Sequence, residues 1–112
     1  MPTSCCFSQG KWTQKANFGG AARYDAVGFS IGTKGYIGTG NNSGNILYQD
    51  FWEWDQKTDT WTQKADFGGG QRRLAVRFSI GAKGYIGTGE NGFNNYKQDL
   101  WEYDPVTNSW TQ

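Results

Sequence analysis

The chain has 112 residues, a length that suits one domain with a core of moderate size. Eleven Lys and Arg against ten Asp and Glu leave a formal net charge of +1, so neither a nucleic acid nor a membrane surface is indicated as a partner. No apolar run approaches the roughly 20 residues that cross a bilayer, and no secretory signal is visible at the start. We therefore expect a soluble chain, without a prediction of its compartment.

The composition is that of an all-β protein. Seventeen Gly, six Trp, six Tyr and seven Phe accompany only two Pro, a profile of short aromatic strands separated by turns. The chain contains no histidine, and its two cysteines are neighbours, Cys5 and Cys6. Adjacent cysteines rarely meet disulfide geometry, so we expect free thiols, with an intermolecular bridge as the alternative. We expect no metal site and no cofactor.

An internal repeat organises the chain after a short N-terminal extension, residues 1–10. Residues 12–60 align without a gap on residues 61–109, and 30 of these 49 pairs are identical. WTQKANFGG recurs as WTQKADFGG, FSIGTKGYIGTG as FSIGAKGYIGTG, and QDFWEWD as QDLWEYD. Such periodicity predicts a repeat architecture in which each unit packs on the next.

Each unit predicts four strands in chain order. Glycine-containing turns such as GTKG link the first strand to the second, and Asp, Asn and Pro mark the turn before the fourth. The predicted strands are residues 25–31, 35–39, 50–54 and the stretch from Trp61 in the first unit, and 74–80, 84–88, 99–103 and the stretch from Trp110 in the second. We place the first unit at residues 18–66 and the second at residues 67–112, where the fourth strand is short. Residues 11–17 form an unpaired strand of the fourth type, which could close or extend a neighbouring sheet.

The pattern resembles the kelch repeat. In each unit a strand that ends in Gly-Thr-Gly precedes an aromatic residue, Trp54 or Tyr103, that lies seven positions before Trp61 or Trp110. The resemblance implies β-propeller blades of four antiparallel strands around a channel, two per chain. Gly-Thr-Gly in place of paired glycines, and Trp54 in place of a tyrosine, are departures from the family pattern.

Two blades leave sheet faces uncovered, because propellers have about four to eight blades. We predict that the chain associates with itself, as a trimer or tetramer, into a six- or eight-bladed ring. The alternative is that the chain is part of a larger propeller.

The expected function is non-catalytic binding or scaffolding, with an acidic peptide, a small polar molecule or a carbohydrate as ligand. The kelch resemblance implies arginines at the channel mouth, and a guanidinium pairs well with a carboxylate. The candidate ligand-binding residues are Arg23, Arg72, Arg73, Asn42, Asn45, Asn91, Asn94 and Tyr96. The alternative for these arginines is structural, with packing against aromatic rings or hydrogen bonds to carbonyls.

The repeated aromatic residues are interpreted as core, with sugar stacking as the alternative. They are Trp12, Trp52, Trp54, Trp61, Trp101, Tyr103 and Trp110. No catalytic residue is predicted, because the repeats lack histidine and cysteine, although a sugar-modifying enzyme on the same face stays open as an alternative. The GTGENG stretch at residues 87–92 fits a dinucleotide-binding pattern, but the strand predicted after it argues against that use.

Overall fold

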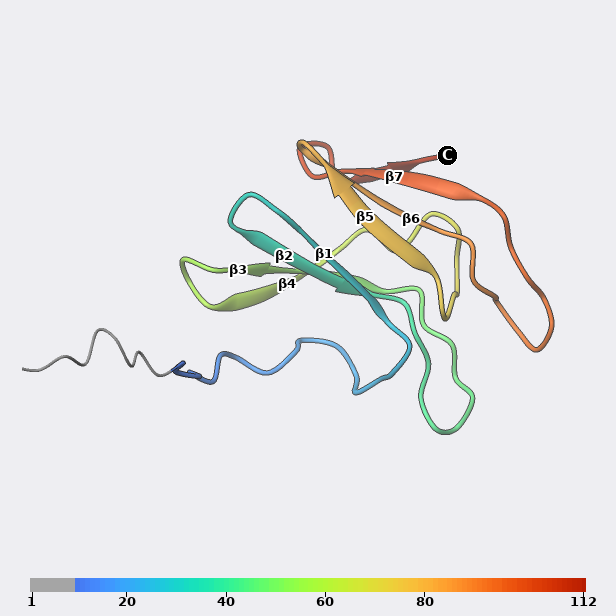
Figure 1. The fold of residues 1–112 in the computed structure, drawn as a ribbon, viewed down its shortest axis with the longest axis horizontal. Coiled ribbons are helices and arrows are strands. Elements are labelled where there is room, and N and C mark those ends of the chain that lie inside the picture. Colours follow the sequence, from blue (N-terminus) through green and yellow to red (C-terminus); the bar gives the residue numbers. More distant parts are fainter. Residues whose placement is uncertain (1–9) are drawn as a thin grey trace, which may run out of the picture.

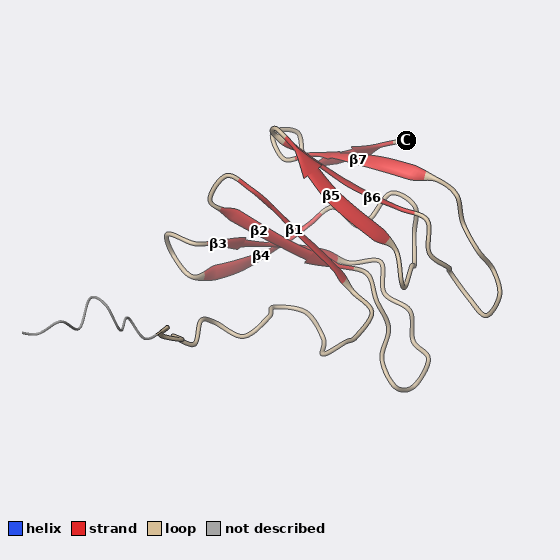
Figure 2. Cartoon of the chain, in the orientation of Figure 1, coloured by secondary structure: helices blue, strands red, loops and turns tan. Residues whose placement is uncertain are grey.

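The computed structural model describes residues 10–112, and Cys5 and Cys6 lie outside the described part. This part of the chain is all-β and contains no helix. It forms two four-stranded antiparallel sheets with strand orders β1-β2-β3-β4 and β5-β6-β7-β8. Figures 1 and 2 show each sheet as a set of consecutive strands, with long loops projecting from one end of the pair. The expected all-β class and the four antiparallel strands per repeat are confirmed.

The first sheet comprises four strands of five residues: β1 (Val27–Ile31), β2 (Lys34–Gly38), β3 (Phe51–Asp55) and β4 (Thr60–Lys64). The first turn is tight, and Gly32 adopts the positive φ of 59° that glycine accepts without strain. β1 begins two residues later than predicted because Asp25 has a φ of 58°, which interrupts the extended backbone.

The second sheet repeats the first: β5 (Val76–Ile80), β6 (Lys83–Gly87), β7 (Leu100–Asp104) and the shorter β8 (Ser109–Thr111). Leu74 has the same φ as Asp25, 58°, and delays the start of β5 in the same way. The pairing register is also repeated, since Phe29 faces Tyr36 in the first sheet and Phe78 faces Tyr85 in the second. The repeated sequence therefore produces a repeated sheet.

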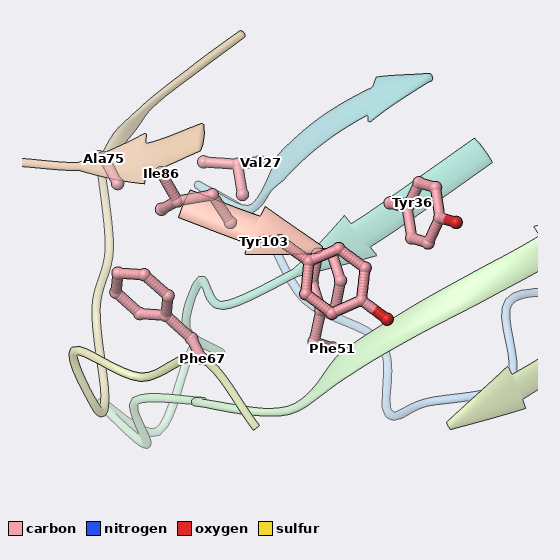
Figure 3. Close-up of a cluster of buried hydrophobic side chains, with 7 residues drawn as sticks. All are labelled: Val27, Tyr36, Phe51, Phe67, Ala75, Ile86 and Tyr103. Carbon is pink, nitrogen blue, oxygen red and sulfur yellow. The ribbon is translucent and has the colours of Figure 1, made fainter. Parts of the chain in front are cut away.

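The core lies between the two sheets. Tyr36 and Phe51 of the first sheet meet Ile86 and Tyr103 of the second, and these side chains are at most 2% exposed (Figure 3). The Phe51 ring lies 4.8 Å from the Tyr103 ring and at 66° to it, an edge-to-face contact that aromatic quadrupoles favour. Stacked sheets thus bury aromatic residues that one sheet alone would leave in water.

Backbone hydrogen bonds join the two units at the loop end of the sheets. Gly40 N donates to Arg72 O at 2.7 Å, and Leu74 N donates to Asp25 O at 3.3 Å. The sheets are therefore held by polar contacts at one end and by the aromatic core along their length.

The segment before the first sheet differs from one expectation. Trp12 was expected in the core, but its side chain is 99% exposed, and residues 11–17 pair with no strand of the described chain. The third strands of the two sheets already pair with β4 and β8, so no strand among residues 10–112 is left to pair with this segment. The GTGENG stretch at residues 87–92 leads into a loop and then β7, without a helix N-terminus to hold a phosphate.

Candidate binding site at the loop end

The loops after β2 and β6 are ordered by local hydrogen bonds. Asn41 bridges Tyr24 and Leu47, and in the second unit Glu90 bridges Arg73 and Tyr96. The Asn42 carboxamide oxygen accepts from Gly44 N at 2.8 Å and from Ile46 N at 3.1 Å, which holds the first loop in a turn. The loops therefore present their side chains from a defined backbone.

Arg23 and Arg72 bind carboxylates of their own sheets. Arg72 donates through its two terminal nitrogens to Asp99 at 2.8 and 2.9 Å, and to the carbonyl of Thr88 at 2.6 Å. Arg23 repeats the arrangement with Asp50, at 2.6 and 2.8 Å. Such bidentate pairs are strong and geometrically specific.

These two guanidinium groups are enclosed. The side chain of Arg72 is 1% exposed and that of Arg23 3%, and the Arg23 guanidinium carbon lies 4.2 Å from the Tyr48 ring centre. The hydrogen bond from Arg72 is the main reason that the pKa of Asp99 lies below its usual 3.8. Neither arginine faces solvent as a free cation, so the expectation that both line a channel mouth is corrected. They instead hold the link before each first strand onto the third strand.

Arg73 occupies a different environment, in a cleft between the two sets of loops. Its Nε donates to Glu90 Oε1 at 2.6 Å, and its side chain is 24% exposed. The cleft has a volume of about 270 Å³ and is lined by Asn45, Leu47, Arg73, Gly92 and Phe93. A cation, an amide and two apolar side chains therefore meet at one opening, with Glu90 neutralising part of the charge.

The other predicted polar residues lie around a second, shallower cleft or in the turns. Asn91 and Tyr96 line a cleft of about 480 Å³ together with Arg72, beside Asp99 and Trp101. The Tyr96 hydroxyl donates to Asn94 Oδ1 at 2.9 Å, and Asn94 itself has a φ of 59°. Asn42 and Asn94 thus shape their loops, whereas Asn45 and Arg73 share the first cleft.

Sequence reasoning missed several residues of this end. Leu47, Gly92 and Phe93 lie at positions where the two repeats differ, so the repeat gave no reason to select them. Asn41 was also missed, although it is fully buried and neither polar atom of its side chain has a hydrogen-bond partner within the described chain. Cross-strand partners in a ladder share a face, so Asn41 lies on the same face as Leu47.

The aromatic residues predicted as core divide into three groups. Tyr103 is fully buried, and Trp12 is exposed. The remaining members are partly buried: Trp52, Trp54, Trp61, Trp101 and Trp110. Trp52 and Trp101 each donate an indole N–H to the aspartate that also receives the arginine, at 2.8 and 2.9 Å. These contacts give the indoles structural roles.

No group of three or more His, Cys, Asp or Glu residues within residues 10–112 could hold a metal ion. In the same part of the chain no helix is long and apolar enough to span a membrane.

Comparison with protein-family models gives no match, and no curated protein matches either. Among solved structures, the chain is similar to one described as "Structure of YjhT", with a TM-score of 0.66 and 25% sequence identity. The similarity covers 81% of this chain and 26% of that chain, so the chain spans about a quarter of the length of that structure. The likeness agrees with an all-β arrangement of repeated four-stranded sheets.

Proposed function

We propose that the two sheets are kelch-type blades of a β-propeller and that the protein is a non-catalytic binding or scaffold module. The 49-residue repeat, the consecutive order of strands in both sheets and their aromatic contact support this assignment. A two-blade chain of this kind associates with copies of itself, as a trimer or tetramer, into a six- or eight-bladed ring.

The ligand is an acidic peptide or another small carboxylate-bearing molecule, bound at the cleft around Arg73. One observation carries this proposal. Of the three predicted arginines, Arg73 is the one whose side chain lines the cleft between the loops of both blades. Arg23 and Arg72 keep their charges within the blades. A ligand carboxylate shares or replaces Glu90 as the partner of Arg73, while Leu47 and Phe93 contact its apolar part.

Calorimetric titration with a hexaglutamate peptide, at low and high salt, tests this site. Arg73→Gln should weaken binding on the order of tenfold and reduce its salt dependence. Glu90→Gln should strengthen binding, because it releases the guanidinium from its internal partner.

Arg77→Gln is the matched control, since it removes the same charge from β5 and Arg77 lies outside the cleft. Equal losses in the Arg73 and Arg77 variants would mean that the peptide responds only to net charge, and the site would then be rejected.

A second candidate is that the chain is a two-blade part of a longer propeller. The match to a structure of about three times its length favours this reading, because 81% of the chain corresponds to 26% of that structure. A longer natural reading frame with further copies of the repeat would establish it.

A further inference from the structure

The contact between the two sheets provides a template for a second contact of the same kind. Phe29 of β1 lies against Gly84 of β6, and a Cβ added at Gly84 would collide with the Phe29 ring. Tyr103 lies 5.6 Å from Tyr36 and 4.8 Å from Phe51, measured between ring centres. The contact therefore joins an apolar face of the first sheet to a face of the second sheet that has a glycine notch.

The outward face of the second sheet repeats the apolar face of the first. Val76 and Leu100 correspond to Val27 and Phe51 at the 49-residue offset. Val76 is 47% exposed and Leu100 46%, whereas Val27 is 2% exposed and Phe51 0%. Phe78, the counterpart of Phe29, is 40% exposed, and among the aromatic rings of residues 10–112 it stacks on Tyr85 alone, at 5.0 Å. The apolar face is thus buried in the first sheet and exposed in the second.

The outward face of the first sheet repeats the notched face of the second. Gly35 corresponds to Gly84, and Trp54 corresponds to Tyr103. A Cβ at Gly35 would meet only a Trp54 ring atom at 3.9 Å, an ordinary contact. The notch that Phe29 fills at Gly84 is therefore open at Gly35.

We propose that a second copy of this chain docks head to tail on these faces, with Phe78 of one copy over Gly35 of the next. This deepens the self-association part of the proposed function and rests on it. Trp54 of the receiving copy then takes the place that Tyr103 has within a chain, against Tyr85 and Leu100 of the incoming copy. Because the two faces of the contact differ, each copy can both receive and donate, and successive copies can close a ring.

The position of the N-terminal segment adds a steric consequence. Ala16 N donates to Asp59 Oδ1 at 2.9 Å, and Trp61 Nε1 donates to Ala16 O at 3.2 Å. Ala65 makes the matching bonds with Asn108 and Trp110, at 3.0 and 3.2 Å. Residues 11–15 therefore stand next to the first sheet as β4 stands next to the second.

Docking by the template would place β8 of the incoming copy where residues 11–13 of the receiving copy already lie. One of the two segments must move. Residues 11–15 read KWTQK and correspond to β4, which pairs along five residues of β3, whereas β8 pairs with only three residues of β7. The longer segment offers the more extensive ladder, so residues 11–15 replace β8 as the neighbour of β7 and bury Trp12 against Tyr103 of the other copy.

Analytical ultracentrifugation over a range of concentrations tests the docking faces. The wild-type chain should sediment as a multiple of its 12.5 kDa mass. Gly35→Val should fold as a monomer, because a Cβ there makes only an ordinary contact with Trp54, but should block the Phe78 ring. Phe78→Ala should raise the dissociation constant on the order of 30-fold, the loss expected for a central interface aromatic.

Matched controls are Gly92→Val and Phe93→Ala, which change an open glycine and an exposed phenylalanine away from both sheet faces. Both should associate like the wild type, and circular dichroism should show the same fold for all five proteins. A monomeric wild type at every concentration would overturn self-association. An oligomer that neither Gly35→Val nor Phe78→Ala weakens would overturn these faces yet leave ring assembly standing, and the hexaglutamate titration tests the ligand site independently of either result.

Covalent trapping tests the strand exchange. Thr111 faces Glu102 in the β7–β8 ladder, and Thr13 occupies the same repeat position as Thr111. In a background with Cys5→Ser and Cys6→Ser, a mixture of Thr13→Cys and Glu102→Cys chains should form a disulfide-linked heterodimer on oxidation. A mixture of Thr13→Cys and Val106→Cys chains is the control. If both mixtures cross-link equally, or neither does, the exchange is wrong.

Discussion

At the scale of single residues, the decisive side chain is Arg72. It connects the link before β5 to the start of β7, and its guanidinium is enclosed by Asp99, the Thr88 carbonyl and the Phe67 ring. A buried charge with several fixed partners cannot be removed without leaving those partners unsatisfied. Arg72 is therefore a structural residue, although an arginine next to Arg73 in the predicted loop is also the residue type expected to bind a carboxylate ligand.

Replacing Arg72 with Met should destabilise the protein by about 3–5 kcal/mol, because the Asp99 carboxylate stays in place without its partner. Urea denaturation followed by fluorescence measures the change, and Arg77→Gln, at an exposed position of β5, serves as the control with an expected loss below about 1 kcal/mol. The pKa of Asp99 lies below its unfolded value of 3.8, so the pair contributes fully above pH 3.8 and its contribution is lost as the pH falls through the folded pKa. The Arg72→Met variant should lack this part of the acid sensitivity, and equal stability of the two variants would contradict the structural role.

The arginines show which parts of the site could be predicted from the sequence and which could not. Arg23 and Asp50 recur as Arg72 and Asp99 with the same separation of 27 residues, a signal for pairing that the repeat contains. The cleft around Arg73 had no such signal, because it forms where loops of both units meet and those loops differ in sequence. Trp12 was assigned to the core on repeat identity alone, but burial also needs a neighbouring strand, which a single chain does not place there.

At the scale of elements, each third strand supports contacts on both of its faces. Tyr103 of β7 is fully buried against the first sheet, and its hydroxyl donates to Asn108 Oδ1 at 2.9 Å. On the other face, Glu102 accepts a hydrogen bond from the Tyr85 hydroxyl at 2.8 Å. Strand positions and pairing were predictable because the repeat fixes turns and alternation, whereas the strand limits shifted where Asp25 and Leu74 take positive φ.

Burial and the nearby charges of Glu53 and Asp104 raise the pKa of Tyr103 to about 12, from 10.0. Between pH 10 and 12 the unfolded chain loses this proton while the folded chain keeps it, so stability should fall over that range by up to roughly 2 kcal/mol and be unaffected below it. Denaturation series at successive pH values measure the slope, and Tyr103→Phe should show a smaller one. An unchanged slope in this variant would assign the alkaline transition to other groups.

At the scale of the whole molecule, the two sheets depend on each other for a core. Phe51 of the first sheet lies within 4.8 Å of Tyr103 and 4.9 Å of Trp110, both from the second sheet. Neither sheet encloses these rings alone. The described chain should therefore unfold as one unit.

Phe51→Ala should lower stability by about 3–5 kcal/mol while keeping a single unfolding transition, because the cavity opens in the shared core. Calorimetry combined with far-ultraviolet circular dichroism measures the loss of stability and the number of transitions. Leu100→Ala, measured on the monomeric protein, is the control, because Leu100 occupies the same repeat position but is exposed in a single chain. Two separate transitions in the Phe51 variant would show that the sheets fold independently.

The difference between Phe51 and its counterpart Leu100 has a consequence for any closed assembly. The interface inside a chain sets Phe51 against Tyr103. In the proposed ring, the interface between chains would set the smaller Leu100 against Trp54. Interfaces within chains and interfaces between chains then alternate around the ring, so the number of blades is even. On dilution the interfaces between chains should dissociate first and release folded chains whose internal interface is intact. Assembly would then be reversible without unfolding.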